Sequence, residues 1–288
     1  MGSQTLVPEL GEALGSWAVD PLTVAALLAI AGAYLVGLVR VAGAGRRFGL
    51  GRVAAFASGW LVLGLALLSP IDVYADVSFS VHMAQHLLLT FVAPVLLAIG
   101  APLTLALGAL PARGARALTR TMGSRAVGWL AAPVAGWSLF VGMPILVHAT
   151  PLFEWSLASP GWHALEHGLW IGAALVFWWP IVGVDVSPRP VGYGVRLLSL
   201  TLAMPAMSFL ALGIYAADRP LYGAYAALPS PWGPDALGDQ RNAAAMMWIA
   251  GNLALVVAML LVAAMWKRHD DERQRRLEMR EDAALPTA

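Results

Sequence analysis

The chain has no cysteine among its 288 residues. Disulfide bonds, thiolate metal ligands and thiol redox chemistry are therefore excluded. Charge is also scarce, because Asp, Glu, Lys and Arg together make up 12% of the residues, whereas soluble domains carry about 25%. Hydrophobic residues reach 59% and the mean hydropathy is +0.70. This composition excludes an ordinary soluble domain and favours a membrane protein.

The N-terminal segment lacks the basic residues that open a signal peptide. Its charged side chains are acidic, namely Glu9, Glu12 and Asp20. We therefore expect the first apolar run to be retained as a membrane span.

Long apolar runs separated by prolines predict an all-α, polytopic membrane protein, since about 20 apolar residues are enough to cross a bilayer as a helix. We expect a seven-transmembrane-helix bundle with spans at residues 21–40, 52–69, 79–100, 127–148, 161–182, 195–215 and 242–266. Pro94, Pro144 and Pro205 fall inside spans, where proline kinks a helix.

Basic residues gather on one side of this predicted bundle. Sixteen of the 18 Lys and Arg residues lie there, and only Arg219 and Arg241 lie on the other side. The positive-inside rule then puts the N-terminus outside and the C-terminus in the cytoplasm. We expect an extracytoplasmic segment at 1–20, a transmembrane domain at 21–266 and a charged cytoplasmic tail at 267–288. Ten of the 17 acidic residues fall on the outer side, where they would concentrate cations.

Five of the six histidines fall at the outer end of the predicted bundle. His82 with His86 and His163 with His167 form two pairs spaced i,i+4, which places both rings of a pair on one helix face. His148 ends the fourth span at similar depth. Titratable groups at membrane depth usually face the bundle interior and serve a ligand or a proton.

This cluster predicts a metal site, although packed or interfacial histidines are the alternative. Met83 adjoins the first pair, and Met246 and Met247 lie at similar depth on the last span. Imidazole together with thioether suits Cu(I), while imidazole alone suits zinc, copper or iron. Copper is the hypothesis, with zinc and haem as alternatives. The candidate ligands are His82, His86, His163 and His167, completed by His148 or Met83.

A second interpretation comes from residues 163–167, which match the H-x-x-E-H motif of inverted zincins. There the glutamate, here Glu166, acts as general base beside two zinc-binding histidines. A catalytic zinc needs a third protein ligand, which would have to come from His148 or the first pair. A zinc-dependent hydrolase therefore stays an alternative, as does a copper transporter. The nearly apolar inner halves of the spans weigh against transport.

Several segments resemble the CtaG family of bacterial cytochrome c oxidase assembly factors (the Bacillus type). The resemblance is carried by residues 80–89 (SVHMAQHLLL) with 100–103 (GAPL), by 163–167 (HALEH) with 177–180 (FWWP), and by the looser matches 239–240 (DQ) with 246–248 (MMW) and 20–22 (DPL). It covers about residues 20–266.

The resemblance implies a multi-pass protein of the bacterial plasma membrane that is needed to produce active haem–copper oxidase and is not itself an enzyme. Expected partners are cytochrome c oxidase subunits and the lipid bilayer, with an extracytoplasmic copper chaperone as a possible metal donor and no nucleic acid. We therefore predict a copper site on the outer face that passes its metal to an oxidase subunit. A scaffold that only holds a subunit is a further alternative, and the loop 216–241 is expected to act as a lid or a docking surface.

Overall fold

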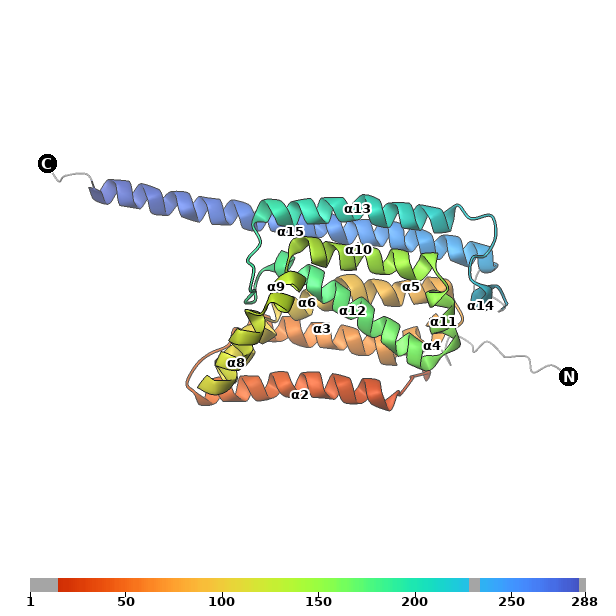
Figure 1. Ribbon diagram of the computed structural model, residues 1–288, viewed down its shortest axis with the longest axis horizontal. Helices are drawn as coiled ribbons and strands as arrows, with labels where there is room; N and C mark the ends of the chain where they lie inside the picture. The colour runs from red at the N-terminus through yellow and green to blue at the C-terminus, as the bar shows by residue number, and fades with distance from the viewer. Residues whose placement is uncertain (1–14, 228–233, 285–288) are drawn as a thin grey trace.

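The computed structural model describes residues 15–227 and 234–284, and every regular element of two or more residues in these ranges is helical. The elements are α2 (Pro21–Gly43), α3 (Leu50–Leu68), α4 (Pro70–Ala75), α5 (Phe79–Leu87), the π-helix η1 (Leu88–Val92), α6 (Ala93–Ile99), α7 (Pro102–Ala109), α8 (Ala112–Met122), α9 (Arg125–Leu130), α10 (Pro133–Ala149), α11 (Leu152–Ala158), α12 (Pro160–Val182), α13 (Tyr193–Tyr215), α14 (Gly223–Ala226) and α15 (Ala236–Ala284). The longer helices lie side by side along one axis (Figure 1). The all-α prediction is confirmed for the described residues.

The described residues contain six helices long and apolar enough to cross a membrane, and up to seven if the pair α10 and α11, bent by 74°, counts as one span. The predicted span 127–148 is interrupted in the structure, because α9 ends at Leu130 and α10 begins only at Pro133. Proline disfavours helical backbone in the residue before it, and Ala132 is extended with ψ 134°. Which end of the bundle faces outside stays a prediction from the arginine distribution.

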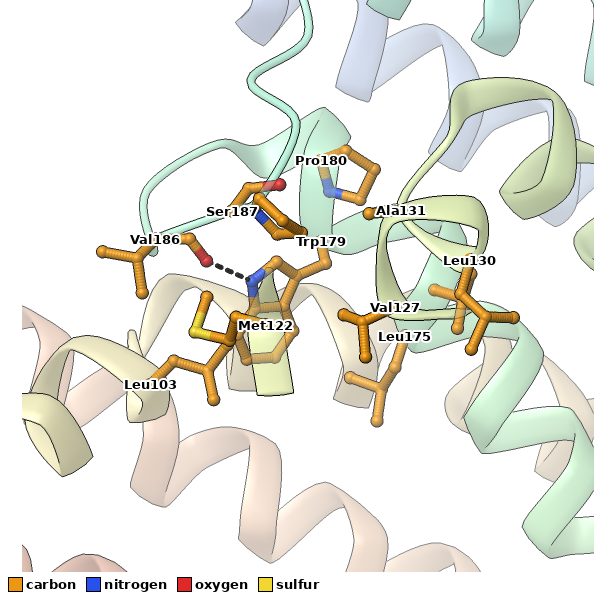
Figure 2. Close-up of a pocket in the computed structure, with 12 residues that line it drawn as sticks. Leu103, Met122, Val127, Leu130, Ala131, Leu175, Trp179, Pro180, Val186 and Ser187 are labelled. Carbon is orange, nitrogen blue, oxygen red and sulfur yellow. Dashed lines mark hydrogen bonds between the residues drawn. The ribbon is translucent and has the colours of Figure 1, made fainter. Parts of the chain in front are cut away.

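The two ends of the bundle hold different short helices and loops (Figure 1). The histidine end holds α4, α11 and α14, and the arginine end holds α8, α9 and the loop 183–192. A groove of about 320 Å³ at the arginine end is lined almost wholly by apolar side chains (Figure 2). The Trp179 indole donates a hydrogen bond to the Val186 carbonyl (3.4 Å), and Ser187 supplies the groove's hydroxyl group. Its lining contains no histidine or carboxylate and a single methionine, Met122, so this groove offers no set of ligands for a metal.

The predicted kink at Pro94 takes the form of a π-helical turn. Proline has no N–H, so the Thr90 carbonyl four residues earlier loses its helical donor. The chain widens into η1 just before Pro94, and the buried Trp178 indole on α12 donates to the Thr90 carbonyl at 2.8 Å. A hydrogen bond between helices, from Trp178 of α12 to Thr90 of η1, thus replaces the bond that Pro94 cannot form.

Close packing of α10 on α12 depends on Gly136. A Cβ at that position would lie 3.0 Å from the Val176 carbonyl oxygen and 3.3 Å from the Cα of Phe177. Small residues let helix backbones approach closely in membrane bundles. Beside this crossing the rings of Phe140 and Phe177 stack with centroids 4.0 Å apart. The crossing fixes how α10 and α12 carry their histidines toward one end.

The last helix continues well beyond the rest of the bundle (Figure 1). α15 runs without interruption from Ala236 to Ala284, through the predicted boundary at residue 267. All side chains from 267 to 280 are exposed. The predicted tail is thus the continuation of the last span as a helix, and the membrane boundary at 267 stays a prediction.

Candidate metal centre

The first histidine pair lies at the buried start of α5. His82 is fully buried and His86 is 3% exposed. Their Nε2 atoms are 3.0 Å apart, as the i,i+4 spacing predicts for two rings on one helix face. The start of α5 is held by Asp239 of α15, whose carboxylate accepts a hydrogen bond from the Phe79 amide at 2.7 Å.

Tyr225 on α14 determines which nitrogen of His82 carries the proton. Its hydroxyl lies 2.7 Å from the Ala75 carbonyl and 3.1 Å from His82 Nδ1. Burial raises the pKa of Tyr225 well above its usual value, so the hydroxyl keeps its proton and donates it to the carbonyl. The tyrosine oxygen then accepts a hydrogen bond from His82 Nδ1–H. The Nε2 lone pair of His82 therefore points toward His86.

Glu166 of α12 completes a group of three buried donors. Its Oε1 lies 3.7 Å from His86 Nε2 and accepts a hydrogen bond from the Trp170 indole at 3.1 Å. Ligand atoms of His82, His86 and Glu166 all lie within 4.8 Å of one another. Glu166 Oε2 and His86 Nδ1 are buried without a hydrogen-bond partner among the described residues. Buried polar atoms are normally paired, so this donor set fits a bound cation.

The second histidine pair faces the first across the helix contact. The His163 ring is stacked on His82 with centroids 5.6 Å apart, and the His167 ring lies 6.0 Å from His86. Within the described residues, the Nε2 atoms of His163 and His167 are buried and have no hydrogen-bond partner. The structure thus brings together the four histidines that the sequence singled out.

Asp72 and Asp76 line the approach to this cluster from the surface. His163 Nδ1 lies 3.8 Å from Asp76 Oδ1, and the Asp76 side chain is 64% exposed. Asp72 accepts a hydrogen bond from the buried Gln85 amide at 2.7 Å. Burial raises the pKa of the Asp72 carboxyl group above the usual aspartate value. Asp76 and His163 therefore form the exposed edge of a site whose other donors are buried.

His148 is separated from the four histidines by the ring of Phe153. Its Nδ1 is 2.9 Å from the Tyr222 hydroxyl. The Phe153 ring lies 5.0 Å from both His148 and His82. His148 is outside the three-donor group, so its predicted role as a completing ligand would require Phe153 to move.

Met83 is also buried, but it lines a small cavity that is distinct from the group of His82, His86 and Glu166. With His86, Met207 and Met247 it lines a small cavity of about 20 Å³. Met246, also considered from the sequence, is not part of this lining.

The sequence-based interpretation missed that Glu166 lies beside His86 and could be a ligand, and it missed the tyrosines that contact His82 and His148. Glu166 was considered as a hydrolytic base or an orienting carboxylate. In the structure it joins the histidines of the other helix, not the pair that flanks it in the motif. Tyr222 and Tyr225 lie in the loop 216–241, which the sequence marked only as a lid or docking surface. No local spacing signals their contacts, which span 74 and 143 residues.

Comparison with known proteins confirms the family resemblance found in the sequence. Residues 32–269 match the model of the cytochrome c oxidase caa3 assembly factor family, Caa3_CtaG. The chain is 33% identical over 276 residues to an uncharacterized protein of Mycobacterium leprae, covering 92% of this chain and 41% of that protein. It is 30% identical over 283 residues to an uncharacterized protein of Mycobacterium bovis, covering 96% of this chain and 42% of that protein.

The chain thus spans less than half the length of the curated relatives it matches. No solved structure matches it. The family model covers most of the chain, including all five histidines of the histidine end. The chain belongs to the cytochrome c oxidase caa3 assembly factor family.

Proposed function

We propose that the chain takes up a copper ion at the histidine end and passes it to a subunit of a caa3-type cytochrome c oxidase during assembly. The observation that supports this most directly is the group of His82, His86 and Glu166, buried and within reach of one ion. A polar network that served packing alone would be expected to pair its nitrogens and oxygens. Here several of them are left for a cation.

Copper is favoured over zinc by the neighbouring sulfur. Imidazole and carboxylate donors suit several metals, whereas thioether ligands select Cu(I). Three methionine side chains line the cavity beside His86. Membership of an oxidase assembly family supports the same choice, because haem–copper oxidases contain copper.

Uptake would begin at the exposed edge formed by Asp76 and His163. An exposed carboxylate attracts a cation, and the imidazole beside it can accept the ion as first ligand. His82 and His86 lie directly behind this edge and would hold the ion out of water. Release to a partner would follow the same path in reverse, which suits a cargo that must leave again.

The topology belongs to this proposal. With the arginine end in the cytoplasm and the N-terminus outside, the histidine end opens on the outer face of the bacterial plasma membrane. Copper delivered outside the cell, by a chaperone or as a free ion, would then reach Asp76 without crossing the bilayer.

The test is the copper content of the purified protein in detergent after loading with Cu(I). We expect near-stoichiometric copper in the wild type and little in the double variant His86→Ala/His167→Ala. The matched control is His269→Ala, which removes the sixth histidine from the exposed part of α15 and should leave copper unchanged. Full copper content in the double variant, or full oxidase activity in cells that carry it, would refute the proposal.

The zinc hydrolase alternative makes a different prediction for Glu166→Gln. If Glu166 is a ligand, as its position beside His86 indicates, this variant binds copper more weakly. If Glu166 is a general base, the variant keeps its metal and loses hydrolytic activity. Zinc in the purified protein together with the second result would favour the hydrolase.

A further inference from the structure

A small cavity beside His86 is lined by further side chains that could bind a metal. The cavity of about 20 Å³ is lined by His86, Thr90, Met83, Met207 and Met247 together with apolar side chains. Its size suits one water molecule or one metal ion, because a water needs roughly 10–15 Å³. The first four of these residues are each at most 5% exposed. The cavity is therefore deep inside the bundle.

Two polar atoms of the lining residues have no hydrogen-bond partner in the described part of the chain, namely His86 Nδ1 and Thr90 Oγ1. Thr90 lies in the π-helical turn η1. Such turns are frequent at functional sites. The cavity thus combines an unpaired imidazole nitrogen with an irregular turn of the same helix.

The hydrogen bonds around His82 determine which nitrogen of His86 carries the proton. Because His82 Nδ1–H is held by Tyr225, His82 Nε2 is an acceptor, and its partner at 3.0 Å is His86 Nε2. His86 then carries its proton on Nε2. Its Nδ1 is left unprotonated, with a free lone pair and no partner in the described structure.

Methionine is enriched among the side chains that line this cavity. Methionine accounts for 11 of the 288 residues, yet three of the nine lining residues are methionines. They come from three helices, with Met83 on α5, Met207 on α13 and Met247 on α15. Neutral thioethers together with imidazole suit Cu(I), since thioether is a soft ligand and zinc is only borderline soft.

We propose that this cavity is a Cu(I) site with His86 Nδ1 and the thioethers of Met83, Met207 and Met247 as its ligands. The inference rests on the proposed function and narrows the cargo to the reduced ion. A neutral imidazole has one free lone pair, so His86 would bind an ion either through Nε2 beside His82 and Glu166 or through Nδ1 beside the methionines. A zinc ion could occupy the first of these positions but would find no suitable partners in the second.

The experiment is X-ray absorption at the copper edge on the full chain in detergent, loaded with one equivalent of Cu(I). We expect a shell of sulfur scatterers in the wild type. The variant Met83→Leu/Met207→Leu nearly conserves side-chain volume and should lose that shell. Outer-shell partners of a metal already contribute about 10- to 100-fold in affinity, so the variant should bind Cu(I) at least roughly tenfold more weakly.

The matched control is Met204→Leu/Met259→Leu, which changes one methionine on α13 and one on α15 that do not line the cavity. It should keep both the sulfur shell and the affinity. Copper bound by nitrogen and oxygen alone would overturn the inference, and so would unchanged Cu(I) affinity in Met83→Leu/Met207→Leu. Either result would leave the proposed copper binding at the histidine end intact. A wild type that binds no copper would instead refute the proposed function itself.

Discussion

The carboxylate of Asp239 joins the first turn of α15 to the first turn of α5. It accepts hydrogen bonds from the amides of Phe79 (2.7 Å) and Ser80 (3.3 Å) and from the Ser78 hydroxyl (3.3 Å). These amides are among the first N–H groups of α5, which have no partner within their own helix. Replacing Asp239 by Asn keeps the shape but removes the charge and turns an NH₂ group toward the same donors.

The expected cost combines two effects. Loss of an N-terminal cap destabilises by about 0.5–2 kcal/mol, and hydrogen bonds to a charged group contribute about 1.5–3 kcal/mol. Since Asn keeps one accepting oxygen, we expect Asp239→Asn to lose about 2–3 kcal/mol in the free energy of unfolding. At roughly 2–4 °C per kcal/mol for a chain of this size, Tm should fall by about 4–12 °C. Cu(I) affinity should fall as well, because both histidines of α5 lie in its first two turns.

Thermal unfolding followed by tryptophan fluorescence in detergent measures the first effect, and competition with a Cu(I) chelator measures the second. The control is Asp218→Asn, an exposed acid at the same end of the bundle, which should change neither. If Asp239→Asn unfolds at the same temperature as Asp218→Asn and binds copper as tightly, the cap does not hold α5 in place and the reasoning fails.

Three further substitutions test other contacts. Trp178→Phe removes the indole N–H that serves the Thr90 carbonyl, and leaving that buried acceptor unpaired should cost about 1–3 kcal/mol, seen as a lower Tm with copper still bound. Tyr225→Phe removes the acceptor for His82 Nδ1–H, so chelator competition should show about 10- to 100-fold weaker Cu(I) binding; unchanged affinity would exclude a positioning role. Gly136→Leu places a side chain where even a Cβ lies 3.0 Å from backbone; it should unfold at a markedly lower temperature, and a wild-type Tm would contradict the helix crossing.

Most of the helices could be predicted because their signals are local. Pro21 at the first helical position and Asp20, whose carboxylate accepts from the Thr23 amide at 2.6 Å, mark the start of α2. The spacing of His82 and His86 was enough to predict that both rings lie on one face. Apolar runs placed α2, α3, α12 and α13 to within a few residues of their ends, whereas α15 extends well beyond its predicted run.

The rest depends on contacts between distant parts of the chain. Asp239 caps a helix that starts 160 residues earlier, and Tyr225 holds a histidine 143 residues away. Neither partner can be read from spacing along one helix. Glu166 was visible in its motif, but its position beside His86 follows from how α12 crosses α5. The break before Pro133 was missed because an uninterrupted apolar run hid it.

Because α15 is straight, the distance of each of its basic side chains from the membrane surface grows steadily along the helix. Between residues 267 and 280 the helix carries six basic side chains, and each residue advances it by about 1.5 Å. The Debye length at physiological salt is about 8 Å, which corresponds to roughly five residues of a helix that leaves the bilayer upright. If α15 leaves the bilayer at the predicted boundary, residue 267, then Lys267 and Arg268 would lie within range of anionic lipid headgroups, whereas the four arginines from Arg273 to Arg280 would be screened from them. These arginines would be available to charged partners in solution instead of to lipid headgroups.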